Sequence, residues 1–266
     1  MPAIQISHLR AKVKLLTGLL DSPGKLLPEL LRFYSAYSDL TFQSNSLSVK
    51  AGTLFAFRTP ALMNREIEIA FSKFALTQPD QLCEFIDLLM KYPELEPRQL
   101  AATLLGALPA EYFDRVIPRL TTWANEIADP EDLTWLFTRA TANLRREKPE
   151  IWLSMLQQWL ESSDEKSRVI AVYGLSSMIT DSSLTSLPLI FKHLQPLLLE
   201  ENSKISVYLE TIIERLIEKS ETETIYFLKQ TLSSSPTQTL IRMVRRSIPL
   251  FSAEGQESLK IFLRTR

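Results

Sequence analysis

The sequence predicts an all-α fold, a right-handed solenoid in which antiparallel helix pairs stack on one another. Three observations support this prediction. Apolar residues recur at helical spacing along most of the 266-residue chain, short polar or proline-containing breaks separate these segments, and similar positions return about every 35 residues. The chain also has only six glycines and no sustained period-two alternation, which argues against a turn-rich β protein.

The clearest helix pair is predicted between residues 148 and 180. Pro149 suits the first turn of a helix, where its missing N–H breaks no hydrogen bond. Ser162 and Glu165 have the spacing of a capping box and are expected to open the second helix. Each helix would bury one apolar face. The residues of this face are Ile151, Trp152, Met155, Leu156, Trp159 and Leu160 on the first helix, and Ala171, Val172, Leu175, Met178 and Ile179 on the second.

The remaining chain is expected to form one elongated domain. Residues 7–20 and 24–40 predict an N-terminal helical hairpin, followed by a polar loop at 41–53, so that 1–53 precedes a repeat core at 54–266. One irregularity is predicted around two prolines: a helix should begin near Leu187 and kink or stop before Leu197, because Pro196 removes a backbone donor.

Marker positions define the repeat. Their successive spacings are 33, 36, 34, 36 and 35 residues, and they are Arg65, Arg98, Thr134, Arg168, Lys204 and Thr239. Two of them share a sharper pattern, in which a small residue three positions on permits close helix approach and a leucine four further on faces the core: Arg98, Ala101 and Leu105, and Arg168, Ala171 and Leu175. A two-helix unit of about 35 residues cannot bury its own faces, so neighbouring units must stack, as in HEAT-like repeats.

Composition excludes several function classes. The net charge is −1, which gives no general attraction to nucleic acid or to an anionic membrane. Cys83 is the only cysteine and falls on an apolar helix face, so we expect an inert buried thiol and no intrachain disulfide. No apolar segment is long enough to span a membrane and no secretion signal is legible, so we expect a cytoplasmic protein.

Catalytic and metal-binding signatures are also missing from the sequence. His8 and His193 lie far apart without further ligands at metal spacing, and no nucleophile elbow occurs, so we expect no metal and no cofactor. Closely spaced acids such as Glu66 and Glu68 diverge on a helix and are expected to be solvated. A monomer is expected.

Basic residues on the second helix of each pair suggest a binding surface. In two-helix solenoids these helices usually line the concave side, where a basic stripe could follow a phosphate backbone. An alternative is that each arginine pairs with an acid of the adjacent unit and holds the stack together, and the basic C-terminal end has the further alternative of a solvated face. The candidate binding residues are Arg98, Arg139, Arg168, Lys204, Arg242, Arg245 and Arg246.

The stretch KPEIWLSMLQQWLESSDEKSRVIAVYGL, together with residues 93–220 around it, distantly resembles the DNA alkylation repair family, the AlkD-type glycosylases that excise alkylated purines. The resemblance implies a DNA-contacting role for Arg168 and a place beside the lesion for Tyr208. An ungapped comparison puts Thr134 where the family has its catalytic acid, whereas a two-residue shift brings Asp132 there and leaves Trp135 nearby.

Three hypotheses follow from these observations. The first is a non-catalytic HEAT-like solenoid that binds a protein or duplex DNA in its concave groove. The second is a divergent alkylpurine glycosylase that uses Asp132 as its acid, Arg168 on the phosphates and Trp135 or Tyr208 against the lesion. The third is a scaffold whose C-terminal cluster of Arg242, Arg245 and Arg246 meets an acidic partner.

Overall fold

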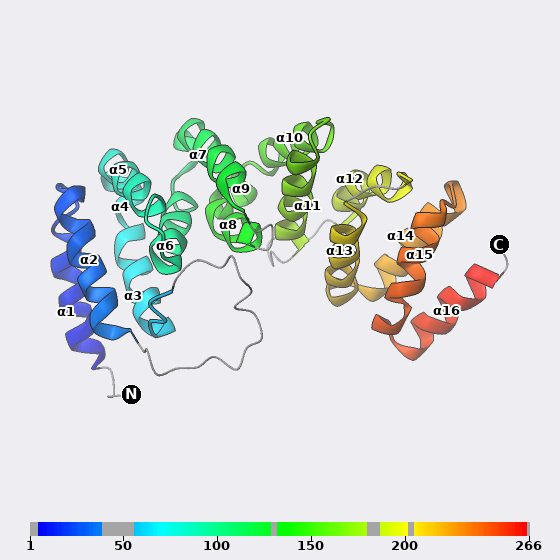
Figure 1. Cartoon of the computed structure of the whole chain (residues 1–266), viewed down its shortest axis with the longest axis horizontal. Coiled ribbons are helices and arrows are strands. Elements are labelled where there is room, and N and C mark those ends of the chain that lie inside the picture. The colour runs from blue at the N-terminus through cyan, green and yellow to red at the C-terminus, as the bar shows by residue number, and fades with distance from the viewer. Residues whose placement is uncertain (1–4, 39–55, 129–131, 180–186, 202–204, 265–266) are drawn as a thin grey trace. The chain divides into compact units, whose positions relative to one another are not determined.

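A computed structural model describes residues 5–38, 56–128, 132–179, 187–201 and 205–264, and these are helical with short connections and contain no strand (Figure 1). The predicted all-α class is therefore confirmed. The contacts divide the chain into two compact units, unit 1 (residues 1–148) and unit 2 (149–266). The predicted loop at 41–53 lies outside the described residues, and the single elongated domain stays a prediction.

Unit 1 contains the N-terminal hairpin and the helices that pack on it. Its elements are α1 (Ile6–Thr17), α2 (Pro23–Tyr37), α3 (Ala61–Ser72), α4 (Phe74–Thr77), α5 (Pro79–Met90), α6 (Leu95–Leu105), η1 (Ala110–Tyr112), α7 (Phe113–Glu126), α8 (Asp132–Ala140) and α9 (Ala142–Glu147). Helices α1, α3, α6 and α8 pack in succession, and we call them row B of unit 1. Row A consists of α2, α5 and α7, and the strongest contact between the rows joins α5 to α6.

Unit 2 begins with the helix pair that the sequence predicts most clearly. Its elements are α10 (Pro149–Leu160), α11 (Glu165–Ile179), α12 (Leu187–Leu199), α13 (Ser206–Lys219), α14 (Glu221–Ser234), α15 (Gln238–Ser247), η2 (Ile248–Leu250) and α16 (Ala253–Arg264). Helices α11, α13 and α15 pack in succession as row B of unit 2, and α12, α14 and α16 form row A. Helix α10 packs on α11.

The apolar positions predicted from the repeat pattern are buried. Ala101 and Leu105 on α6 are fully buried, and so are Ala171 and Leu175 on α11. A side chain larger than alanine at these row B positions would push the neighbouring helix away, because protein interiors are close-packed. The small residue and the leucine therefore do what the sequence pattern predicted: they permit close approach and fill the core.

The start of α11 differs from the predicted capping box. The Asp164 carboxylate accepts hydrogen bonds from the backbone N–H of Ser167 at 2.8 Å and from its hydroxyl at 2.8 Å, so Asp164 is the N-cap and Glu165 is the first helical residue. These hydrogen bonds lower the pKa of Asp164. Ser162 instead accepts a hydrogen bond from the Asp164 backbone N–H at 3.1 Å. The prediction placed the cap two residues too early because aspartate is an equally good capping residue.

Helix α12 also differs in part from its prediction. It begins at Leu187, as expected, but it continues through Pro196 and ends at Leu199, so the predicted stop before Leu197 is wrong. Leu194, Leu197 and Leu198 are buried on both sides of the proline. Their burial holds the last turn in helical conformation although proline supplies no hydrogen bond there.

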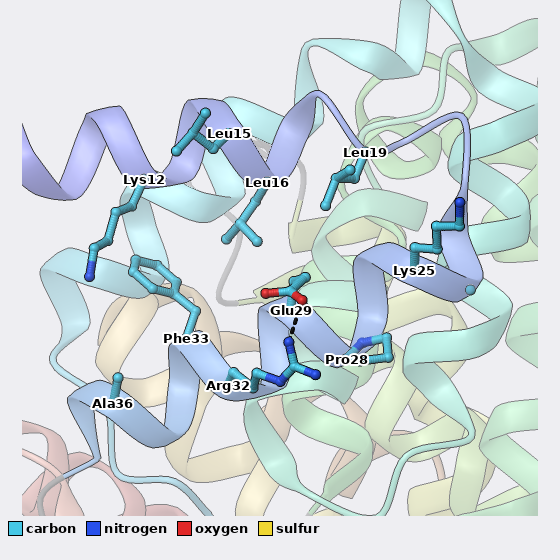
Figure 2. Close-up of a pocket in the computed structure, with 11 residues that line it drawn as sticks. Lys12, Leu15, Leu16, Leu19, Lys25, Pro28, Glu29, Arg32, Phe33 and Ala36 are labelled. Carbon is cyan, nitrogen blue, oxygen red and sulfur yellow. Dashed lines mark hydrogen bonds and ion pairs between the residues drawn. The ribbon is translucent and has the colours of Figure 1, made fainter.

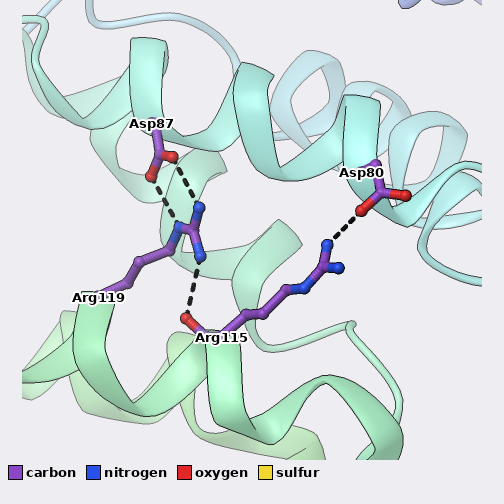
Figure 3. A network of polar contacts seen from close by, with 4 residues as sticks. All are labelled: Asp80, Asp87, Arg115 and Arg119. Carbon is purple, nitrogen blue, oxygen red and sulfur yellow. Dashed lines mark hydrogen bonds and ion pairs between the residues drawn. The ribbon is translucent and has the colours of Figure 1, made fainter.

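Two arginines of α7 link it to α5 in row A of unit 1 (Figure 3). Arg119 donates to both carboxylate oxygens of Asp87, at 2.8 and 2.7 Å, and to the backbone carbonyl of Arg115 at 3.1 Å. Arg115, one turn before Arg119 on α7, pairs with Asp80, and its side chain is more exposed than that of Arg119. The hydrogen bond to Asp87 raises the pKa of Arg119. A two-pronged pair of this kind fixes the geometry of both helices.

We predict that the Arg119–Asp87 pair contributes measurably to packing. A double-mutant cycle with Arg119→Ala and Asp87→Ala should give a coupling free energy of about 1 kcal/mol at low salt, because two parallel hydrogen bonds orient the charges. The measurement is urea unfolding of the two single variants and the double variant. The same cycle on Arg115 and Asp80 is the matched control and should give the smaller coupling, so equal couplings would contradict a special role for the two-pronged geometry.

Two further findings concern the single cysteine and the membrane-spanning segments that the sequence analysis considered. Cys83 on α5 is 4% exposed, and burial raises the pKa of its thiol, which confirms the predicted buried cysteine. Across the described ranges, no helix combines the length and apolar character that crossing a bilayer requires.

Candidate macromolecule-binding surface

The candidate site residues share one structural property. Each one that falls in a described range lies on a row B helix: Arg98 on α6, Asp132, Trp135 and Arg139 on α8, Arg168 on α11, Tyr208 on α13, and Arg242, Arg245 and Arg246 on α15. Lys204 lies outside the described residues. The sequence pattern thus selects row B in each unit, because the candidate residues were taken from the second helix of each predicted pair.

Arg139 connects three successive row B helices of unit 1. Its guanidinium donates to the Thr103 hydroxyl on α6 at 2.8 Å and to the Glu68 carboxylate on α3. The Thr103 hydroxyl itself donates to the backbone carbonyl of Gln99, one turn earlier on α6, at 3.0 Å. Arg139 and Glu68 are 34% and 24% exposed. The charge of Arg139 is therefore matched within the chain and partly removed from water.

Glu66 and Glu68 illustrate how the acids of α3 are used. They diverge on the helix, as predicted, but the expectation that they are solvated is wrong for both. Glu66 is 14% exposed and accepts two hydrogen bonds of 2.8 Å from Arg10 on α1, whereas Glu68 accepts from Arg139 on α8. The Arg10 partner lowers the pKa of Glu66. Two acids two positions apart thus link α3 to a different neighbour each.

Asp132 and Trp135 lie together in the first turn of α8. The indole Nε1–H donates to the Asp132 carboxylate at 3.1 Å, and both side chains are half-buried. A carboxylate in the first helical turn is favoured by the positive end of the helix dipole. The arrangement places an acid beside an aromatic ring, and the carboxylate by itself also suits the start of a helix.

Arg98 has a local partner. Its Nε donates to the backbone carbonyl of Tyr92 at 2.7 Å, in the connection between α5 and α6. Carbonyls that follow a helix lack an intrahelical donor, so a nearby guanidinium satisfies one of them. Arg98 therefore holds the turn of its own helix pair.

Arg168 lines a pocket of about 550 Å³ within unit 2. It pairs with Glu200, which follows α12, and its buried Nε has no hydrogen-bond partner among the described residues. Lys192 and His193 of α12 line the same pocket. Burial, together with the charge of Lys192, lowers the pKa of His193, so this imidazole favours its neutral form. The positive charge of Arg168 in this pocket is therefore paired with the carboxylate of Glu200.

Row B of unit 2 is joined by aromatic and charged contacts. Tyr208 on α13 meets Tyr173 on α11 edge to face, with ring centroids 5.7 Å apart, and Arg215 donates to the Ser176 hydroxyl. Arg246 on α15 pairs with Glu210 on α13 at 3.0 Å although its side chain is 69% exposed. Tyr208 thus takes part in the packing between two helices.

Arg242 and Arg245 are the most available cations of row B in unit 2. Both are exposed on α15; Arg242 donates only a long hydrogen bond, 3.3 Å, to the Gln238 carbonyl one turn earlier, and Arg245 pairs with no acid in the described part of the chain. Together with Arg246 they present three positive charges on a ten-residue helix.

The chain matches no protein-family model, no curated protein and no solved structure. The description of the site therefore depends on the geometry of its residues alone. Within the described residues no three histidine, cysteine, aspartate or glutamate side chains come together in a manner suited to a metal ion.

The acids that pair with the row B arginines were not identified as site residues from the sequence. Glu68, Glu200 and Glu210 stand 71, 32 and 36 residues from their arginine partners. These separations are about one or two times the repeat length that the sequence predicts. A search for opposite charges separated by one period would have found two of the three pairs.

Proposed function

We propose that the chain is a non-catalytic α-solenoid of HEAT-like repeats that binds a partner protein along the row B helices of unit 2. The third sequence hypothesis, a scaffold with an acidic partner, is the form that the geometry supports best. The family resemblance contributes the solenoid architecture to this proposal, and the side-chain contacts contribute the choice of partner.

The solenoid is supported by the sequence separation of residues in contact. Stacked units of equal length bring together side chains that lie one period apart. The separations cluster near 35 residues in both units, for Thr103 and Glu68, Asn143 and Leu108, Arg115 and Asp80, Tyr173 and Tyr208, Phe191 and Phe227, and Arg246 and Glu210.

One observation carries the choice of a protein partner over DNA. Four of the arginines expected to grip phosphates already have acceptors: Arg98 a carbonyl, and Arg139, Arg168 and Arg246 a carboxylate each. A phosphate backbone would have to displace these acids, and like charges at an interface cost affinity. The exposed Arg242 and Arg245 remain for carboxylates of a partner protein.

The test uses single charge reversals. Partner proteins are captured by chemical cross-linking in the cells that make the chain, identified, purified and returned to the recombinant chain. We expect Arg245→Glu to weaken binding about tenfold, because an attractive charge pair becomes repulsive at the interface. Arg264→Glu, which reverses an exposed arginine on α16, is the matched control and should leave affinity unchanged. Equal loss in both variants would mean that only the overall charge matters.

DNA is the decisive alternative outcome. A duplex of about 20 base pairs should not bind measurably at ~50 mM salt if the proposal holds. Binding that weakens steeply with salt and falls further in Arg168→Ala would overturn it in favour of nucleic acid. Release of 7-methylguanine or 3-methyladenine from alkylated DNA that disappears in Asp132→Asn would make the chain a glycosylase.

A further inference from the structure

An apolar groove runs between the first two helices of unit 1 (Figure 2). Leu16 of α1 and Phe33 of α2, 8% and 7% exposed, form its floor. Leu15 stands at its edge and is 74% exposed, while Leu19 is half-buried at the end nearest the turn. The groove has a volume of about 760 Å³. An apolar floor therefore lies beneath one exposed leucine and one half-buried leucine.

Among the described residues of unit 1, only those of the α1–α2 hairpin line the groove. Helix α1 meets α3 through a different side, where Arg10 pairs with Glu66 and where Val13 and Thr17 lie opposite α3 residues. The α1 residues that line the groove lie at i, i+3 and i+4 from Lys12, which is the spacing of a single helix face, and Leu19 in the turn after α1 extends this lining. Within the described residues, the α1–α2 hairpin is thus packed on the α3 side, and no other element lines the groove.

The shape of the groove suits a helix. On α2 its wall extends from Gly24 to Ala36, and the twelve steps between these residues, at about 1.5 Å each, make it about 18 Å long, which is the length of a helix of about 12 residues. Gly24, Pro28 and Ala36 are small or compact, so a third helix could approach α2 closely. Ridges of apolar side chains from that helix would fill the space between Leu15 and Phe33.

The charge around the groove specifies its partner. Lys12, Lys25 and Arg32 stand along the walls, and Glu29 is the single acid among the lining residues and pairs with Arg32. Helix α1 carries no acidic residue at all. A helix with glutamate or aspartate on both sides of its apolar face would place carboxylates beside Lys12 and Lys25.

We propose that this groove binds an amphipathic α-helix of a partner protein, with leucine-like residues on one face and acidic residues flanking them. This is the helix-in-groove mode of recognition, in which apolar anchors supply affinity and charges select the partner. The inference does not depend on the row B proposal, because the groove is formed by α1 and α2 alone and involves neither Arg242 nor Arg245.

The test uses the full chain and a labelled helical peptide. The probe is a 14-residue peptide with leucines at i, i+3, i+4 and i+7 and glutamates beside them; its counterpart has lysines in place of the glutamates. By fluorescence anisotropy we expect the acidic peptide to bind at micromolar concentration and the basic peptide at least tenfold more weakly. Because the flanking charges are exposed, the difference between the peptides should shrink in high salt. Equal affinities for the two peptides would overturn the proposal.

Leu15→Glu provides the matched variant. It places a like charge beside the peptide's glutamates at the groove edge and should weaken binding at least tenfold, whereas Leu76→Glu, at a leucine of unit 1 that is 76% exposed on α4, should have no effect. Both positions are exposed, so circular dichroism should show the helical fold intact in each variant. Equal weakening by the two variants would contradict a site at the groove.

Three further outcomes are informative. Dimerisation that Leu15→Glu abolishes would assign the groove to a second copy of the chain, and Leu15-dependent binding to anionic lipid vesicles would assign it to a membrane surface; either result would overturn the proposal. Arg245→Glu should leave peptide binding intact. That result separates failure at the groove from failure of the row B proposal.

Discussion

Replacing Gly106 with alanine should lower the free energy of unfolding of unit 1 by about 3 kcal/mol, the largest loss we expect from adding a single methyl group. Gly106 follows α6, and a Cβ built on it would lie 1.9 Å from the backbone carbonyl oxygen of Arg139 at the end of α8. The Gly106 carbonyl also accepts a hydrogen bond from the Asn143 backbone N–H at 3.1 Å. The new Cβ would be fixed to the backbone at residue 106, and the atom it meets is a backbone oxygen. No side-chain rotation can therefore relieve the contact.

Gly24→Ala is the matched control for Gly106→Ala. Gly24 lies in the first turn of α2, and no atom stands within 4 Å of a Cβ placed there. Alanine favours the helix and reduces the freedom of the unfolded chain, so we expect a stabilisation of about 0.5 kcal/mol. Urea unfolding, with hydrogen exchange at the amides of α6 and α8 to locate the effect, measures both variants. Similar stability changes in the two would contradict a steric cause at Gly106.

Arg145→Ala should also destabilise unit 1, by about 3 kcal/mol. The Arg145 side chain is 5% exposed and donates to the carbonyls of Phe137 and Thr138, at 2.7 and 3.2 Å, in the last turn of α8. It also donates to the Thr141 hydroxyl. Removing it takes one donor from each of these acceptors at a helix end, although the Thr141 amide and hydroxyl still donate to the Phe137 carbonyl. It also opens space where the stem of the arginine was packed.

Arg146→Ala tests whether the effect belongs to the buried position. Arg146 is the next residue along the chain, is 62% exposed and pairs with the adjacent Glu147. Its removal should change stability by no more than about 0.5 kcal/mol. Thermal and urea unfolding of the two variants give the comparison. A loss for Arg146→Ala as large as that for Arg145→Ala would show that charge, and not burial, is responsible.

The helices and much of the core could be predicted from sequence because they depend on local chemistry. Pro149 begins α10 as expected, and Leu175 is buried as its pattern requires. Helix starts were less secure where two capping residues lie close together, as with Ser162 and Asp164. Pro196 was predicted to kink or stop its helix, and the stop is wrong. The effect of this proline depends on the burial of the leucines around it, which a local rule does not contain.

The candidate site was predictable in position but not in its chemical state. The marker spacing placed Arg98 and Arg168 on row B helices, and Arg139 lies on the same helix as the marker Thr134, since a helical period fixes which face a residue occupies. Their partners are Tyr92, Glu68 and Glu200, and two of these come from helix pairs other than the arginine's own. Whether a cation is free or paired depends on such tertiary contacts. The groove between α1 and α2 was missed because exposed leucines and buried leucines have the same spacing in the sequence.

The contacts between Arg139, Thr103 and Glu68 limit how the length of this chain can change. Each partner stands 35 or 36 residues from the next. A deletion of that length would remove one helix pair and bring two others into the same register, so an equivalent ladder could form again. A deletion of half that length would exchange a row A helix for a row B helix and set apolar faces against water. Insertions and deletions in homologous chains should therefore occur as whole helix pairs or within the connections between them.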